Sequence, residues 1–239
     1  MRYLVRENKK LWVAVNDNFP ENAQQELRRR ANAVQTWFFD LDETHAFPGK
    51  KIVQRALGTS HLSPRYLAWC TKTVWNLVYK GKTAESERWQ AYINSFLRKE
   101  KSLERVAQSF TAESARESLY TGIEEFCSLF PTADKFYVTR NIAEVTRAYV
   151  ETLCLDGYFA EVNDKGKVVE EYLYDHPHIR RFGVDGDSAE DAEMIKILKF
   201  YDREVISFYS MDKSNRKIDT NFDVFVSKDR TALVDLLRN

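Results

Sequence analysis

Short apolar segments alternate with amphipathic helical segments through the second half of the chain, and this alternation limits the possible fold more than any other feature. Strands are predicted at 135–139, 158–162, 181–186, 204–209 and 222–226. Helices are predicted at 142–155, 167–175, 191–201 and 230–237. Strands that alternate with helices form a parallel sheet covered on both faces. The sequence therefore predicts an α/β fold with a Rossmann-like parallel sheet.

The first half of the chain has a different organisation. Residues 2–15 resemble two short strands joined by a polar turn, which predicts a hairpin at the edge of the fold. A helix that opens at Pro20 and a buried strand at 36–40 follow. We predict three units: an N-terminal extension (1–35), a core (36–47 and 119–239), and an all-helical insertion (48–118), which has helical periodicity and almost no strand pattern.

Composition excludes several classes of protein. Lys plus Arg and Asp plus Glu both number 36, and this balance argues against a general nucleic-acid binder. No apolar run reaches membrane-spanning length, and the first residues lack a signal-peptide pattern. Three widely spaced cysteines form neither a metal motif nor a disulfide framework. We therefore expect a cytoplasmic protein with no membrane partner. The sequence does not indicate whether the protein is a monomer or an oligomer.

Two acidic residues, Asp40 and Asp42, directly follow the apolar strand at 36–40. Burial of a carboxylate is unfavourable, and two neighbouring carboxylates repel each other. A turn or a helix N-cap would explain them, because Asp is common in both. The alternative is a site that uses both acids.

Polar residues also end two later strands. Thr139 ends the strand at 135–139, and Asp187 follows the strand at 181–186, with Asp191 one helical turn further on. Ligands of open parallel sheets bind beyond the carboxyl ends of the strands, so these groups are expected to share one crevice with Asp40. Carboxylate oxygens are hard ligands, and this set suits Mg²⁺.

Charge balance in this crevice predicts a lysine. The negative charges of Asp40, Asp187 and Asp191 would be cancelled by one Mg²⁺ and one lysine, which would leave Asp42 able to hold a proton. The lysine is expected near a helix start between the second and third strand ends. Lys167 is the first choice, and Lys165 is the near alternative.

The ordered motifs resemble those of the haloacid dehalogenase-like (HAD) superfamily, whose members are mostly phosphatases. Asp40, Asp42 and Thr44 match its D-x-D-x-T motif, Thr139 its second motif, Lys167 its lysine, and the acids of "GDSAED" its fourth motif. Each motif alone is weak, whereas the ordered set at successive strand ends is specific. The resemblance covers residues 36–45 and 119–237 and implies that the helical insertion is a C1 cap.

The resemblance implies a role for each site residue. Asp40 would be the nucleophile and Asp42 the acid and base. Mg²⁺ would bind Asp40, the backbone carbonyl of Asp42, and Asp187, with Asp191 nearby. The residues expected to hold the phosphoryl group are Thr44, Thr139 and Lys167.

The predicted activity is Mg²⁺-dependent hydrolysis of a small phosphorylated metabolite through an aspartyl-phosphate. The predicted cap would exclude water and hinder a macromolecular substrate. Two alternatives remain open at this point: a catalytically silent HAD-like binding protein, and a phosphotransferase that uses the same intermediate. The sequence names no particular substrate.

Overall fold

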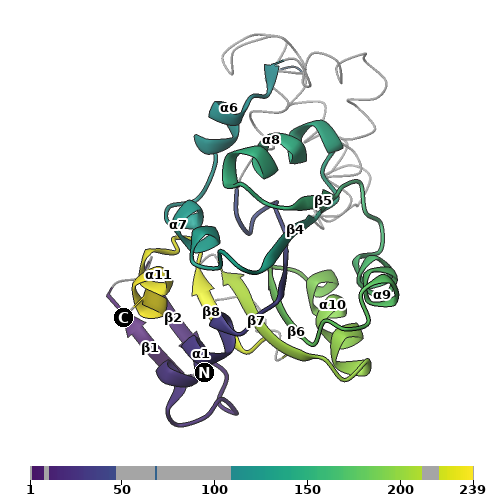
Figure 1. The fold of residues 1–239 in the computed structure, drawn as a ribbon. Coiled ribbons are helices and arrows are strands. Elements are labelled where there is room, and N and C mark those ends of the chain that lie inside the picture. The colour runs from purple at the N-terminus through teal and green to yellow at the C-terminus, as the bar shows by residue number, and fades with distance from the viewer. Residues whose placement is uncertain (1, 8–10, 47–67, 69–108, 212–220, 239) are drawn as a thin grey trace.

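The computed structural model describes residues 2–7, 11–46, 68, 109–211 and 221–238. In these ranges the strands form one sheet, in the order β1-β2-β8-β7-β6-β3-β4-β5 (Figure 1). Their bounds are β1 Arg2–Arg6, β2 Trp12–Val15, β3 Thr36–Phe39, β4 Asp134–Val138, β5 Gly157–Phe159, β6 Arg181–Gly186, β7 Glu204–Met211 and β8 Val224–Ser227. The strands from β8 to β5 are parallel. The predicted α/β class and parallel sheet are confirmed.

Helices cover both faces of this sheet. Their bounds are α1 Ala23–Asn32, α6 Ala112–Arg116, α7 Ile123–Ser128, α8 Ala143–Leu153, α9 Lys165–Asp175, α10 Ala189–Phe200 and α11 Thr231–Arg238. One apolar core includes buried side chains of α1, α7, α8 and α11, and a second core includes those of α9 and α10. Figure 1 shows α9 and α10 side by side, away from α1 and α11. The two cores lie on opposite faces because strand side chains alternate between faces.

Strand β3 shows this alternation directly and explains why the first acidic motif has a fixed position. Trp37 and Phe39 belong to one core and Phe38 to the other, and none of the three has exposed surface. The rings of Trp37 and Phe39 stack with centroids 5.6 Å apart. Gly183 lies opposite Trp37, where a Cβ atom would come within 2.1 Å of the indole. Strand β3 is thus tightly packed between β6 and β4.

The N-terminal hairpin extends the sheet at one edge, as the sequence predicts. Strand β1 pairs antiparallel with β2, and β2 pairs antiparallel with β8. All residues of β2 are buried, whereas β1 is exposed or half-buried. The helix expected to open at Pro20 begins at Ala23. Helix α8 ends at Leu153, earlier than predicted, because Cys154 adopts a left-handed conformation and Gly157 already belongs to β5.

The predicted helical insertion falls mostly on residues outside the described ranges, so the cap stays a prediction. Its two connections to the core are described. Ala46 forms a bridge with Leu119, and the amide of Tyr120 donates to the carbonyl of His45 at 2.9 Å. The outgoing and returning segments therefore lie side by side. Helix α6 packs on α8, where the Thr152 hydroxyl donates to the carbonyl of Ala112 at 3.0 Å.

Among the described residues, no helix has the length and apolar character needed to cross a membrane.

Candidate active site

Three neighbouring strands bring the predicted motifs to one edge of the sheet. Strand β3 lies between β6 and β4, and all three are parallel, so their carboxyl ends are adjacent. The pairing of β3 with β6 continues past the strand end, because the amide of Asp40 donates to the carbonyl of Asp185 at 2.8 Å. This bond fixes the backbone of Asp40 beside the turn that carries Asp187.

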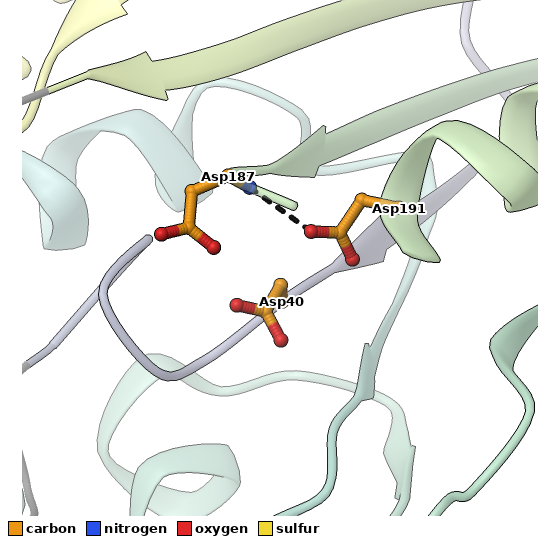
Figure 2. Close-up of side chains that lie close together, drawn as sticks. All are labelled: Asp40, Asp187 and Asp191. Atoms are coloured by element: carbon orange, nitrogen blue, oxygen red, sulfur yellow. Dashed lines mark hydrogen bonds between the residues drawn. The ribbon is translucent and has the colours of Figure 1, made fainter. Parts of the chain in front are cut away.

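The carboxylates of Asp40, Asp187 and Asp191 point toward one another at this edge (Figure 2). Each offers an oxygen, and these three oxygens all lie within 4.8 Å of one another. Asp191 reaches the group from the first turn of α10, directly over the end of β6. A Cβ atom on Gly186 would lie 2.4 Å from the Cβ of Asp191, so a glycine is required there. The structure thus joins three of the predicted metal ligands.

Hydrogen bonds hold the two oxygens of Asp191 in different roles. Its Oδ2 accepts from the Ser188 hydroxyl at 2.7 Å and from the amides of Asp187 and Ser188 at 3.0 Å each. Ser188 in turn caps the helix, which completes a capping box at the start of α10. The other oxygen, Oδ1, faces the ammonium group of Lys165. Asp191 therefore links the helix start to the charged cluster.

Lys165 is the lysine of this cluster. The prediction that Lys167 would hold this position is wrong. The Nζ atom of Lys165 lies 2.6 Å from Asp40 Oδ1 and 2.6 Å from Asp191 Oδ1. The Lys167 side chain is 68% exposed and its Nζ lies 3.7 Å from Glu171. Helix α9 begins at Lys165 because Asp164 caps it, accepting from the amide of Lys167 at 3.0 Å. Lys165 therefore lies in the first turn and points into the site.

Burial and neighbouring charge shift the pKa of each group in the cluster. Burial raises the pKa of Asp40 to about 6, although Lys165 opposes this shift. Burial, together with the charges of Asp40 and Asp191, raises the pKa of Asp187 well above its ordinary value. Burial alone would lower the pKa of Lys165, but Asp191 and Asp40 raise it. The cluster thus holds three buried or nearly buried carboxyl groups and one cation, an arrangement that favours a further positive charge.

Asp42 lies apart from this cluster and has a different partner. The Nδ2 atom of Asn141 lies 3.1 and 3.3 Å from its two carboxyl oxygens. Burial, followed by the charge of Asp40, raises the pKa of Asp42 to about 8. A carboxyl group with this pKa carries a proton at neutral pH and can donate it. Asn141 is not among the site residues predicted from the sequence.

Two threonines predicted to hold a phosphoryl group are fully buried. The Thr44 hydroxyl donates to Asp40 Oδ2 at 3.0 Å, so its observed partner is the predicted nucleophile. The Thr139 hydroxyl oxygen accepts from the amide of Asn141 at 3.1 Å, directly beyond β4. Both side chains shape the loops that carry Asp40 and Asn141.

A buried polar network behind the site was not predicted from the sequence. It consists of Tyr137, His45, Asp185 and Arg230, none of which has exposed surface. No sequence signal marks Asp185 or Arg230, because their pairing joins β6 to the start of α11 across 45 positions.

Solved structures show which fold this arrangement belongs to. The chain resembles cytosolic 5'-nucleotidase IIIB bound to cytidine, with a TM-score of 0.57 and 12% identity over 95% of this chain and 93% of that chain. It also aligns with a substrate-bound phosphoserine phosphatase (TM-score 0.48, 15% identity, 86% and 97% covered). A further match is the putative HAD-hydrolase YfnB from Bacillus subtilis bound to magnesium (0.47, 14%, 86% and 99%).

The first of these likenesses shows that the chain has a HAD-like fold, as the motif order predicts. No protein-family model matches the sequence, and no curated protein matches it.

Proposed function

We propose that this chain is a Mg²⁺-dependent phosphatase that hydrolyses a small phosphorylated metabolite through an aspartyl-phosphate on Asp40. The observation that carries the proposal is the set of carboxyl groups around Asp40. Asp40 faces the ammonium of Lys165 and two further acids, while Asp42, two residues along the chain, has a pKa raised to about 8 by burial. A nucleophile and a protonated acid on one short loop are what phosphate ester hydrolysis requires.

The donor chemistry of the cluster supports a Mg²⁺ ion. Asp40, Asp187 and Asp191 offer only oxygen ligands, and the described part of the site places no sulfur or imidazole among them. Asp40, Asp187 and the carbonyl of Asp42 would bind the ion directly. Asp191 would support the ion indirectly, through the residues that it contacts. When bound, Mg²⁺ would neutralise charge on the phosphoryl oxygens.

The proposed reaction proceeds in two displacements. A carboxylate oxygen of Asp40 attacks phosphorus, and the bond from phosphorus to the ester oxygen breaks. Asp42 gives its proton to that departing oxygen, which leaves as an alcohol. Asp42, now a carboxylate, takes a proton from water, and this water attacks phosphorus and breaks the bond to Asp40. Inorganic phosphate leaves, and Asp40 and Asp42 return to their first states.

The geometry suggests supporting roles for the remaining residues. Lys165, in place of Lys167, would hold a phosphoryl oxygen and neutralise the charge that develops there. Thr44 would orient Asp40 through its hydrogen bond to Oδ2, in place of the phosphoryl contact expected from the sequence. Asn141 would orient the carboxyl group of Asp42. Thr139 would contact the phosphoryl group, as the resemblance implies.

Phosphate release from a panel of phosphorylated metabolites tests the proposal. The panel includes nucleoside monophosphates and phosphoserine, and each is measured with Mg²⁺ and with EDTA. We expect Mg²⁺-dependent turnover of at least one compound and its loss in Asp40→Asn. The matched control is Asp202→Asn, the same change at an exposed residue after α10, and this variant should retain activity. Turnover that survives Asp40→Asn would disprove the assigned nucleophile, and a folded protein with no turnover would refute the proposed function.

A further inference from the structure

Four fully buried polar side chains form a continuous chain of contacts behind the candidate active site. His45 Nδ1 lies 3.0 Å from the hydroxyl of Tyr137, and His45 Nε2 lies 3.1 Å from Asp185 Oδ2. The Nη2 atom of Arg230 donates to both carboxylate oxygens of Asp185 at 2.7 Å each. The residues come from the loop after β3, from β4, from β6 and from the start of α11. The network therefore joins four separate segments.

The chemistry of the partners fixes the proton on the imidazole. A carboxylate can only accept, so the Nε2 atom that faces Asp185 carries the hydrogen. Burial lowers the pKa of His45, although Asp185 opposes this shift, and the ring is therefore neutral. Nδ1 then accepts, and the Tyr137 hydroxyl donates to it. Every hydrogen bond of the imidazole is satisfied in one orientation only.

Backbone contacts connect this network to the predicted nucleophile. The carboxylate of Asp185 accepts a hydrogen bond from His45 Nε2, and the backbone carbonyl of Asp185 accepts one from the amide of Asp40. His45 directly follows Thr44, whose hydroxyl lies 3.0 Å from Asp40. The amide of His45 also donates to the carbonyl of Leu41 at 3.1 Å, which closes the loop that carries Asp42. The imidazole thus fixes the far end of a loop whose near end is Asp40.

Stability alone does not account for such a network. A buried ion pair is often no more stabilising than apolar side chains of the same volume, because both charges lose their hydration. The aromatic rings of Phe39 and Phe126 lie beside the imidazole, with centroids 4.8 and 6.4 Å away, so its surroundings there are apolar. What the polar network adds is a single orientation for the loop.

We infer that His45 is a positioning residue: its hydrogen bond to Asp185 holds the loop 40–46 so that Asp42 and Thr44 keep their places beside Asp40. The expected effect on turnover rests on the proposed phosphatase function. The effect of His45 on the conformation of the loop does not depend on that function. His45 touches no reacting atom. Its contribution is the geometry of the two acids, and misplacement of reacting groups by about 1 Å costs roughly 100-fold in rate.

Three substitutions at one position separate the two hydrogen bonds. His45→Phe removes both, His45→Gln keeps a donor near the Nε2 position, and His45→Asn keeps only a group near Nδ1. We expect kcat for the best substrate of the panel to fall roughly 30- to 100-fold in His45→Phe and His45→Asn, with KM changed less than about threefold. His45→Gln should recover kcat to within about fivefold of the wild type. Equal kcat in the Gln and Asn variants, or a change confined to KM, would overturn the inference.

Hydrogen exchange measured by mass spectrometry tests the fixed loop without any turnover. Exchange of the amides in 40–46 should accelerate in His45→Phe and His45→Asn, while 134–138 and 204–211 keep wild-type rates. Unchanged exchange in 40–46, or equal acceleration in all three segments, contradicts a positioning role. If the wild type releases no phosphate, this measurement still decides the inference separately from the proposed function. If the His45 variants do not fold, Tyr137→Phe removes one hydroxyl from the network and should accelerate exchange in the same segment only.

Discussion

The ammonium group of Lys165 lies 2.6 Å from Oδ1 of Asp40, although 125 positions separate the two residues in the sequence. The same ammonium also meets Asp191, so one buried cation serves two carboxylates. Loss of the cation would leave two neighbouring buried carboxylates without a counter-charge, an unfavourable arrangement. Lys165 therefore has both an electrostatic and a proposed catalytic role.

Replacement of Lys165 by Met should lower kcat at least about 100-fold, because the group that would neutralise phosphoryl charge is removed. Lys167→Met is the matched control, since the Lys167 side chain is exposed and its Nζ lies near Glu171, outside the acidic cluster. It should retain wild-type kcat within about twofold, as is usual for surface substitutions. Steady-state kinetics of both variants check this, with circular dichroism to confirm folding. Loss of activity in Lys167→Met alone would restore the lysine first chosen from the sequence.

Gly186→Ala should disturb the acidic cluster, because Gly186 lies directly against Asp191. The new methyl group would lie 2.3 Å from the carboxyl carbon of Asp191, so the Asp191 side chain must shift from its present position. The probe is Mn²⁺, which takes the same carboxylate ligands as Mg²⁺. We expect its affinity, measured by isothermal titration calorimetry, to fall about tenfold, because displaced supporting groups typically cost that much in metal affinity. Gly157→Ala is the control, because its Cβ atom would meet only the ring of Phe136 at 3.2 Å. Equal Mn²⁺ affinity in both variants would show that the close approach of Asp191 is not needed.

Much of the fold followed from the sequence because alternating strands and helices leave few arrangements. Parallel strands place their carboxyl ends at one edge, so Asp40, Asp187 and Asp191 were correctly expected to meet. The choice between Lys165 and Lys167 depended on where one helix begins. Asp164 was the available signal, since a capping residue moves the helix start to Lys165.

The buried network could not be predicted in the same way. Tyr137 lies in a strand where an aromatic residue is ordinary, and Arg230 precedes a short amphipathic helix as many surface arginines do. The contact of Tyr137 with His45 and that of Arg230 with Asp185 depend on the strand order and on the packing of α11, and neither leaves a local pattern. Asn141 is a similar case, because its contact with Asp42 spans 99 positions.

Arg230→Met should destabilise the protein strongly, by about 3–5 kcal/mol in the free energy of unfolding, because Asp185 would remain buried without its cation. The double variant Arg230→Met with Asp185→Leu should recover part of this loss, since it removes the uncompensated charge as well. Urea unfolding followed by fluorescence gives both values. Arg116→Met is the control: its pair with Glu124 is exposed, and no measurable change is expected. The explanation would be contradicted if the double variant lost more unfolding free energy than the two single variants lose together.

The neutral imidazole of His45 should make stability depend on pH in a predictable direction. Burial lowers the pKa of His45 in the folded protein, whereas the unfolded chain has the ordinary value of about 6.5. Below that value the unfolded chain takes up a proton that the folded protein does not, so stability falls as pH falls. The His45→Phe variant has no imidazole at this position, so its unfolded chain takes up no such proton. From pH 7.5 to 5.5, the wild type should therefore lose about 1 kcal/mol more unfolding free energy than His45→Phe. Urea unfolding of both proteins at the two pH values measures the difference, and other titrating groups cancel in the comparison. A difference of opposite sign would show that the folded protein holds His45 protonated and that Nδ1 donates to Tyr137.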